Sequence, residues 1–130
     1  EQLWCVGSHQ PEPVAVSPGW HGLSNATLNT PWPKLQRLLA GAQTLSAQQV
    51  AASRSHLELL ADTTPAADSA LPETGVGVLM ERLLSPICIR TPAYGTRNST
   101  WLRLTREEIL WHEQDYNEGV QREFQRARLS

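Results

Sequence analysis

The sequence predicts an α+β protein in which an antiparallel sheet is covered by helices on one face. Three observations lead to this class. Short strand-like runs lie at both ends of the chain, amphipathic helical segments lie in the middle, and Gly- and Pro-rich stretches separate them. The order strand, strand, helix, helix and then three or four strands is typical of helices packed on one side of a sheet. A length of 130 residues is that of one ordinary domain.

A β-hairpin is expected at the N-terminus. Residues 2–6 form a short apolar run that ends at Gly7, and a second apolar run, residues 14–16, follows a break at residues 11–13, which read Pro-Glu-Pro. Two such runs joined by a short polar loop are typical of a hairpin. Residues 20–33 are dense in Gly, Asn, Thr and Pro, and predict an ordered loop.

The first helical signal follows this loop. Thr30 can cap a helix, and the prolines after it suit a first helical turn, where a missing N–H costs nothing. Leu35, Leu38 and Leu39 have the spacing of an amphipathic stripe. The helix is expected to end near Gly41.

Further helices and a strand are predicted in the middle of the chain. Ser46 is a suitable cap for a second helix, which should run to Leu60, and residues 78–84 carry a shorter helical pattern. Between them, residues 63–74 are rich in Pro, Ala, Asp and Thr and predict a mobile surface loop. Residues 87–89 read as a strand.

The last third of the chain is strand-like. Residues 99–105 alternate in polarity and contain β-branched and aromatic side chains, and residues 109–112 continue the pattern after a turn. A second turn is expected at residues 115–119. Residues 120–129 predict an imperfect strand, with a helix as the competing interpretation.

Composition excludes several classes of protein. Hydrophobic residues make up 40% and charged residues 18%, which is typical of a globular chain. A net charge of -2 and a pI near 6.1 offer no general attraction to nucleic acid. No apolar run has the length of a membrane span, and no signal peptide is visible. We therefore expect no nucleic-acid partner, no membrane span and a cytoplasmic location, with Glu1 at a processing boundary.

The two cysteines show no metal-binding pattern. Cys5 and Cys88 lie far apart in apolar runs, without a neighbouring Cys or His at ligand spacing. Buried, unreactive thiols are the expectation, and a disulfide between them is not indicated. No structural metal site is predicted.

Two segments carry a specific resemblance. Residues 21–34 read HGLSNATLNTPWPK and residues 94–100 read YGTRNST, entered from residues 86–89. Both resemble, in order and separation, motifs of the NRDE family, which includes transport and Golgi organisation proteins. Asn29 stands where the family often has Asp, and Asn98 where Ser is usual. The resemblance covers nearly the whole chain, so residues 1–130 are identified as the C-terminal part of an NRDE-family domain.

The resemblance implies a fold similar to the N-terminal-nucleophile hydrolases, an αββα sandwich of two antiparallel sheets, of which this chain would form about half. Family members begin with a Cys directly after the initiator Met, followed by Asn-Arg-Asp-Glu. Neither feature is present here. Cys5 follows four residues and cannot supply the free α-amino group that such a nucleophile uses as its base. The nucleophile half is therefore expected to be absent.

Two classes of function follow from the resemblance. The first is amide-bond hydrolysis or acyl transfer, with this chain supporting an N-terminal Cys that lies outside it. The second is a non-catalytic binding or trafficking module for haem or a lipid, which needs only a pocket. Either class takes a small-molecule ligand. The sequence requires no cofactor, and haem is the one cofactor that the resemblance suggests.

Ser24 and Asn25 lie in a Gly-bounded loop just before a helix. A carboxamide there could donate a hydrogen bond to a developing oxyanion, the role that an Asn has in a similar loop of the related bile-salt-hydrolase-like enzymes. An Asn in a turn equally satisfies its own backbone. Both interpretations stay open.

Thr96 and Arg97 lie at the entrance to a predicted strand. Arg97 could grip a carboxylate or phosphate there, and its small neighbours leave room for one. The competing interpretation is an Arg that protects a sheet edge. His21 lies inside the first motif and is the first candidate for an axial haem ligand, whereas the other histidines show no ligand spacing.

Half of a sandwich should leave an apolar sheet face without a partner. We expect that face to contact the missing N-terminal half of the same protein, or a second copy of this chain. The five tryptophans should anchor the core or that interface.

Overall fold

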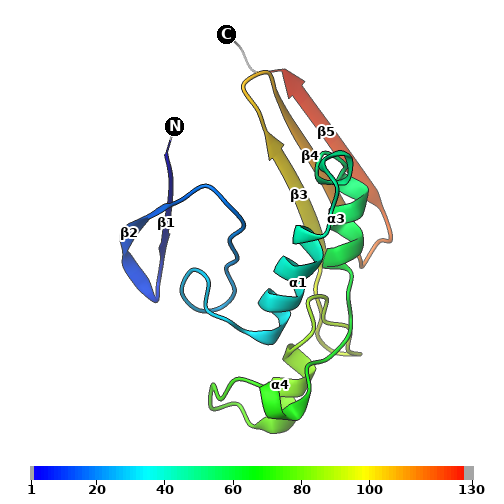
Figure 1. The fold of residues 1–130 in the computed structure, drawn as a ribbon. Coiled ribbons are helices and arrows are strands. Elements are labelled where there is room, and N and C mark those ends of the chain that lie inside the picture. The colour runs from blue at the N-terminus through cyan, green and yellow to red at the C-terminus, as the bar shows by residue number, and fades with distance from the viewer. Residues whose placement is uncertain (1, 128–130) are drawn as a thin grey trace.

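The computed structural model describes residues 2–127 and confirms the α+β class (Figure 1). Two antiparallel sheets are present in this range, of two and three strands. In chain order the elements are β1 (Leu3–Gly7), β2 (Gln10–Val16), α1 (Pro33–Gln43), α2 (Ala47–Val50), α3 (Ser53–Leu60), a 3-10 turn (Asp68–Ala70), α4 (Val78–Leu84), β3 (Asn98–Leu104), β4 (Glu108–Asp115) and β5 (Gln121–Ala127).

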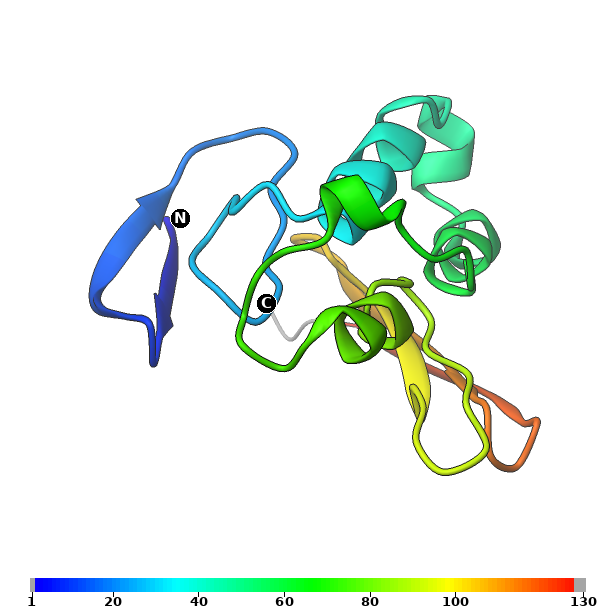
Figure 2. The ribbon, with the colours of Figure 1, turned by 90° about the horizontal axis from the view of Figure 1, so that it is seen from below.

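The predicted hairpin is confirmed, with a longer second strand than expected. β1 and β2 pair from Leu3 opposite Val16 to Gly7 opposite Gln10. Residues 11–13 lie inside β2, but the pairing is irregular there, because the register shifts between the Cys5–Val14 and Gly7–Gln10 pairs. A bulge of this kind tolerates prolines, which cannot donate to a regular ladder. The hairpin forms a sheet of its own and stands apart from the other strands (Figures 1 and 2).

Helix α1 forms where it was predicted but begins differently. Its N-cap is Trp32, in an extended conformation without a side-chain cap bond, and Pro33 occupies the first turn. The expected cap at Thr30 is wrong, because its hydroxyl donates to the Thr27 carbonyl instead. Leu35 lies on the buried face and is 5% exposed.

The single helix predicted from Ser46 to Leu60 is in fact two helices. Ser46 caps α2 as expected, in a reciprocal capping box with Gln49. The chain then becomes extended at Ala52, the N-cap of α3. His56 on α3 approaches the free Val50 carbonyl at 2.9 Å through its ring Nε2, and so satisfies an acceptor at the end of α2.

Residues 87–89 do not form the predicted strand. The Cys88 amide donates to the Asp62 carbonyl, and residues 89–96 fold back on themselves around an isolated bridge between Arg90 and Gly95. The apolar character of this segment reflects burial in the core, where Cys88 is fully buried. Cys5 is only half-buried, which corrects the expectation that both thiols are buried.

The segment from Thr63 to Thr74 includes the 3-10 turn and is held by several side-chain hydrogen bonds. The Ala66 amide donates to the Ser85 hydroxyl at 2.9 Å in a buried contact. Asp68 forms a two-pronged ion pair with Arg82 of α4. The mobility expected for residues 63–74 stays a prediction. The α4 helix over residues 78–84 is confirmed.

The last three strands form one antiparallel sheet in the order β3-β4-β5. This confirms the strand interpretation of residues 121–127; residues 128 and 129 of the predicted strand lie outside the described range. Helix α3 packs on one face of the sheet (Figures 1 and 2). Trp101, which is 9% exposed, lies between them, with its ring 5.9 Å from the His56 ring.

The opposite face of this sheet is not covered by the described helices. Leu102 of β3 pairs with Trp111 of β4, which pairs with Phe124 of β5, so these side chains form a row across the face. Leu102, Leu104 and Phe124 are each more than half exposed.

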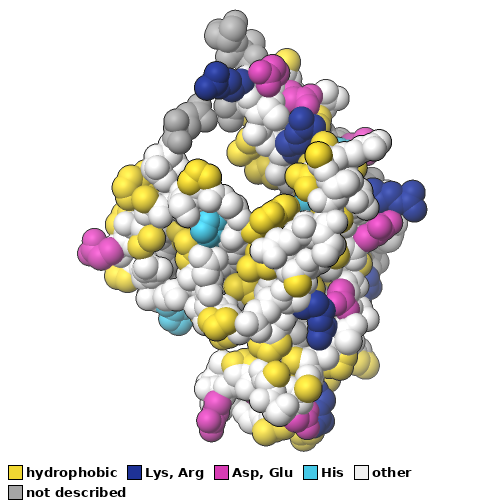
Figure 3. All heavy atoms as spheres, in the orientation of Figure 1, with side chains coloured by type: hydrophobic (Ala, Val, Ile, Leu, Met, Phe, Trp, Pro, Cys, Tyr) yellow, Lys and Arg dark blue, Asp and Glu magenta, His cyan; other side chains and the backbone are white. Residues whose placement is uncertain are grey.

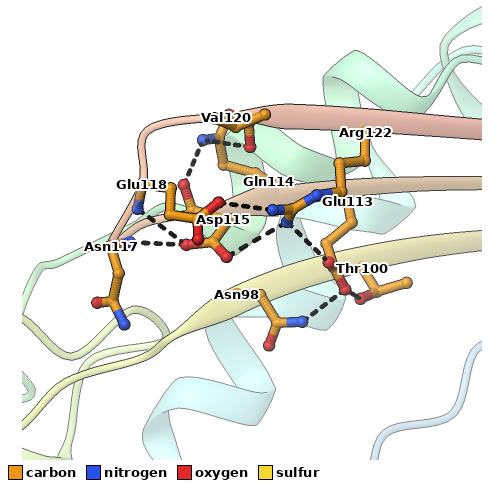
Figure 4. Close-up of polar contacts among 9 residues, drawn as sticks. All are labelled: Asn98, Thr100, Glu113, Gln114, Asp115, Asn117, Glu118, Val120 and Arg122. Atoms are coloured by element: carbon orange, nitrogen blue, oxygen red, sulfur yellow. Dashed lines mark hydrogen bonds and ion pairs between the residues drawn. The ribbon is translucent and has the colours of Figure 1, made fainter.

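A polar cluster closes one end of that face (Figure 4). Arg122 lies 2.7 Å from Glu118, 3.3 Å from Asp115 and 3.6 Å from Glu113. Asp115 also accepts the Asn117 and Glu118 amides, and those bonds, with the Arg122 charge, hold the pKa of the Asp115 carboxyl below its usual value of 3.8. The cluster fixes the β4–β5 turn, in which Gly119 has a φ of 67°.

Candidate functional site

The two sequence motifs meet at one cavity of about 420 Å3. We call it the motif cavity. Asn25, Trp32 and Lys34 from the first motif line it, and so does Tyr94 from the second. Pro33 of the first motif also lines it. The remaining wall comes from the hairpin turn, from the segment before α4, from α4 itself and from the segment after it: His9, Pro72, Thr74, Val76, Glu81, Leu84, Ser85 and Ile89. Its walls are mainly apolar, with a few polar groups among them.

Lys34 is the one cation in this wall. It lies on the first turn of α1, and its ammonium donates to the Leu84 carbonyl at 3.1 Å. The ammonium also lies 5.6 Å from the centre of the Trp32 ring. Burial lowers the pKa of Lys34, and the negative charge of Glu81 opposes that shift only in part. An ammonium has three donors, so two remain for a ligand.

Glu81 is the one carboxylate in the same wall, and it is only 7% exposed. Its Oε1 accepts the Thr74 amide at 2.8 Å and also the Thr74 hydroxyl. These bonds satisfy a carboxylate that burial would otherwise make costly. Lys34 and Glu81 therefore lie in the wall of one cavity on different helices, α1 and α4, and each has its own backbone partner.

The loop of the first motif is held by bonds within itself. Asn29 has a left-handed backbone conformation with a φ of 62°. Its backbone amide donates to the Gly22 carbonyl at 2.8 Å, and its side-chain oxygen accepts the Gly22 backbone amide. Gly22 packs so closely on α1 that a Cβ there would lie 2.3 Å from a methyl carbon of Leu35. This anchor places the loop against α1 and presents Ser24 and Asn25 at its tip.

His21 has both ring nitrogens engaged. The Asn29 carboxamide donates to Nδ1 at 3.0 Å, so the ring proton is on Nε2, which donates to the Ser17 carbonyl at 2.9 Å. Asn29 makes this contact possible, because an Asp at the same position has no N–H to donate. Axial ligation of haem by His21 would require one of these bonds to break.

Ser24 and Asn25 lie together at a second cavity of about 380 Å3, between their loop and the hairpin turn. Cys5 and His9 line the same cavity. Asn25 also lines the motif cavity, and it is exposed. Within residues 2–127 no hydrogen bond holds its carboxamide, which leaves both of its donors for a ligand.

Thr96 and Arg97 lie together elsewhere. The Thr96 hydroxyl accepts the Ile89 amide at 2.9 Å, so this side chain joins two parts of the backbone. Arg97 is exposed, and its carbonyl accepts the Tyr116 amide at 2.8 Å. Its side chain lines a third cavity, which shares Ile89 and Tyr94 with the motif cavity. The predicted site residues thus divide between neighbouring cavities.

A Ser, a His and a carboxylate also meet between α3 and the sheet. The Ser53 hydroxyl lies 2.9 Å and Glu123 lies 3.0 Å from His112, both at the same ring nitrogen, Nδ1. A catalytic relay needs the serine and the acid on opposite nitrogens. We therefore interpret this cluster as a structural link between α3, β4 and β5.

Sequence reasoning missed the residues that give the motif cavity its charges. Lys34 was quoted as part of a motif but not as a site residue, although it is the only lysine in the chain. Glu81 carried no local signal. It was assigned to an ordinary amphipathic helix, and only the folded chain shows that it is buried.

Hydrophobic side chains are exposed over the hairpin and around α4, and charged side chains lie over α3, at the end of the sheet and also near α4 (Figure 3). No group of three or more His, Cys, Asp or Glu side chains suited to a metal ion occurs in the part of the chain that the structure describes. In that same part, every helix is too short or too polar to cross a membrane.

Fold and site together define an α+β protein whose two motifs contribute to one cavity with a half-buried cation and a buried carboxylate in its wall. Sequence comparison identifies its family. The profile of the family Transport and Golgi organisation 2 matches residues 1–118, and the chain belongs to this family. This agrees with the resemblance found in the two motifs.

Three named relatives match with similar identity. The Transport and Golgi organization protein 2 homolog of Homo sapiens is 33% identical over 101 residues, which is 70% of this chain and 36% of that protein. The Mus musculus homolog is 31% identical over the same shares, and the Bos taurus homolog is 34% identical over 68% of this chain and 35% of its own length. The chain thus matches about a third of the length of each.

Proposed function

We propose that this chain is a binding module whose motif cavity holds a small molecule with an apolar body and a carboxylate end, such as a fatty-acid lipid or haem. The position of Lys34 carries this proposal. It places a half-buried ammonium with two unused donors in a wall that is otherwise mainly apolar. A ligand site of this kind is mostly apolar with a few placed polar groups, and a volume of about 420 Å3 suits a small ligand.

Replacing Lys34 with methionine tests this proposal. We expect Lys34→Met to weaken binding of oleate or haem by at least about tenfold, because a charge-assisted hydrogen bond in a partly buried site contributes roughly 1.5–3 kcal/mol. Lys34→Arg should recover most of the affinity, since it restores the positive charge. Trp32 lies in the wall of the cavity, so the change in tryptophan fluorescence of the intact protein measures the binding of either ligand.

Arg106→Met is the matched control, because it removes one positive charge from an exposed turn between β3 and β4. It should change the affinity less than about twofold. Equal losses in Lys34→Met and Arg106→Met would mean that only general charge matters, and would contradict the proposed site. For haem, an unchanged absorption spectrum on addition would exclude that ligand and leave the lipid.

Support of acyl transfer or amide-bond hydrolysis is the second candidate function, and Asn25 favours it. Its carboxamide is exposed, lines two cavities and has no hydrogen-bond partner within residues 2–127. Such a donor could stabilise an oxyanion formed by an N-terminal Cys outside this chain, with Arg97 and Thr96 of the neighbouring cavity as supporting residues. As an oxyanion donor, Asn25 would support a reaction whose nucleophile lies in another part of the protein.

The two candidates differ in one assay. If the intact protein hydrolyses small amides, Asn25→Ala should lower kcat by about 100-fold or more with little change in KM, as expected for loss of an oxyanion donor. If the intact protein binds oleate or haem and does not hydrolyse small amides, the result supports the binding module. In that case His21→Ala tests the haem ligand, because loss of a Soret shift would assign His21 as axial.

We also propose a partner for the sheet face that the described helices leave uncovered. This chain would be the C-terminal part of a longer domain and form half of a two-sheet sandwich, and the N-terminal part of the same domain would cover that face. The support is the exposed row of Leu102, Leu104 and Phe124, together with relatives about three times as long as the matched region. The unpaired cysteines suit a cytoplasmic location, which we also propose.

Residues 1–130 prepared alone test this interface. We expect them to self-associate through the uncovered face, because several large apolar side chains there are more than half exposed to water. Light scattering should report dimers or larger species, and Leu102→Gln with Phe124→Gln should reduce them. A monomer at all concentrations would contradict the proposed interface.

A further inference from the structure

The cavity that Arg97 lines has an unusual charge content. Its volume is about 460 Å3, and its wall runs from Ile89 to Arg97 and includes Tyr116 and Asn117. Arg90 and Arg97 both belong to this wall, and no Asp or Glu does. A concave site with two guanidinium groups and no carboxylate attracts an anion.

Tyr116 positions both arginines. The Arg90 guanidinium stacks over the Tyr116 ring, with 4.1 Å between its central carbon and the ring centre. The Tyr116 amide donates to the Arg97 carbonyl at 2.8 Å. Stacking occupies the flat face of a guanidinium and leaves the N–H groups at its edge for a ligand. One residue therefore fixes the side chain of Arg90 and the backbone of Arg97.

The ring of Tyr116 is itself held in place. Its hydroxyl donates to the Ser99 hydroxyl at 3.1 Å, and Ser99 is buried on β3. Burial raises the pKa of Tyr116, an effect that the Arg90 charge opposes only in part, so the hydroxyl is neutral and remains a donor at neutral pH. The platform under Arg90 is thus rigid before any ligand arrives.

The nearest carboxylates are already engaged. Asp115 and Glu118, on either side of the lining residues 116 and 117, both pair with Arg122. Arg90 also borders the cavity beneath α3, which holds three carboxylates. Glu58 pairs there with Arg54, Glu113 pairs with Arg122, and Glu123 contacts His112. Neither Arg90 nor Arg97 forms an ion pair within residues 2–127, so both charges remain available.

We propose that this cavity, which we call the arginine cavity, binds the phosphate group of a ligand between Arg90 and Arg97. A phosphate dianion balances two guanidinium charges, whereas a single carboxylate would leave one of them unbalanced. The carboxamide of Asn117 offers a further donor, and its side chain points away from the Arg122 cluster (Figure 4). The site is separate from the motif cavity, although Ile89 and Tyr94 belong to both walls.

Titration of the intact, 15N-labelled protein with inorganic phosphate tests this site. Saturable shifts of the Thr96, Arg97, Tyr116 and Asn117 amides are expected. Arg90→Gln and Arg97→Gln should each weaken phosphate binding by about tenfold or more, since charge-assisted bonds are the strong ones. Arg106→Gln, which removes the same charge from an exposed turn, should change it less than about twofold.

Two variants of Tyr116 separate positioning from folding. Tyr116→Phe keeps the ring under Arg90 and loses only the bond to Ser99, so it should weaken phosphate binding less than about twofold. Tyr116→Leu removes the ring and should lose about fivefold or more, because the cation–π contact that orients Arg90 contributes roughly 1 kcal/mol. Loss of affinity in Tyr116→Phe as large as in Tyr116→Leu would overturn the assigned role of the ring.

Two outcomes would overturn the proposal as a whole. One is a loss in Arg106→Gln equal to that in Arg90→Gln, because binding would then follow net charge alone. The other is acetate binding at least as tightly as phosphate with the same amide shifts, because the site would then select a carboxylate. Neither outcome depends on oleate or haem binding at Lys34. Failure of the phosphate proposal would therefore not contradict the proposed ligand site in the motif cavity.

Discussion

Replacing Trp101 with alanine is expected to lower the free energy of unfolding by about 3–5 kcal/mol, the range for removing a large aromatic side chain from a core. Trp101 is the largest buried side chain of the described residues. Its ring stacks near His56 of α3 and meets the edge of the His112 ring at 5.4 Å. The substitution would leave a cavity between α3 and the sheet, where few other large side chains are buried.

Urea unfolding followed by circular dichroism measures this effect. Trp4→Ala is the matched control, because Trp4 lies on the hairpin and is 58% exposed. It should cost less than about 1 kcal/mol, as surface substitutions usually do. Similar losses from the two variants would show that the contact between α3 and β3 does not dominate the stability of the fold.

Replacing Gly95 with alanine is expected to destabilise the protein by about 1–3 kcal/mol, the usual cost of overpacking. A Cβ at this position would lie 2.8 Å from the backbone oxygen of Ile89. That atom cannot turn aside as the end of a side chain can. The Arg90–Gly95 bridge and the bond from the Thr96 amide to the Ile89 carbonyl would both be displaced.

The same substitution should weaken ligand binding in two places at once. Ile89 and Tyr94 line both the motif cavity and the arginine cavity, so a shift of this bridge changes both walls. Thermal unfolding measures the stability, and titrations with oleate and with phosphate measure the two sites.

Gly7→Ala provides the control, because an added Cβ there meets nothing within 4 Å. Gly7 lies at the end of β1, far along the chain from the Arg90–Gly95 bridge, and its substitution should leave both titrations unchanged. Retention of both affinities in Gly95→Ala would contradict the close-packing argument.

Local patterns predicted most of the helices and strands correctly. The hairpin, the capped start of α2, the short α4 helix and the last three strands all depend on neighbouring residues, and each was recognised from them. The errors arose where a local signal had a tertiary competitor. The apolar residues 87–89 have the composition of a strand, but their amides bond to Asp62 and Thr96 and not to a neighbouring strand.

The break between α2 and α3 has a similar origin. The apolar spacing continues through both helices, and periodicity alone therefore predicted one. The chain bends at Ala52, so that α3 packs on the sheet and His56 reaches both Trp101 and the carbonyl of Val50. Contacts distant in sequence outweigh a weak helical preference over a few residues.

The sequence by itself determined the family, the α+β class and the two motif segments, because those segments are long and locally specific. Only the tertiary structure decided which side chains share a site. It placed Lys34 of one motif in the same cavity wall as Glu81, which lies outside both motifs, and it placed Asn25 and Arg97 in different cavities. The physical reason is that a cavity is bounded by elements far apart in the chain, and the burial and charge of its wall exist only once those elements pack together.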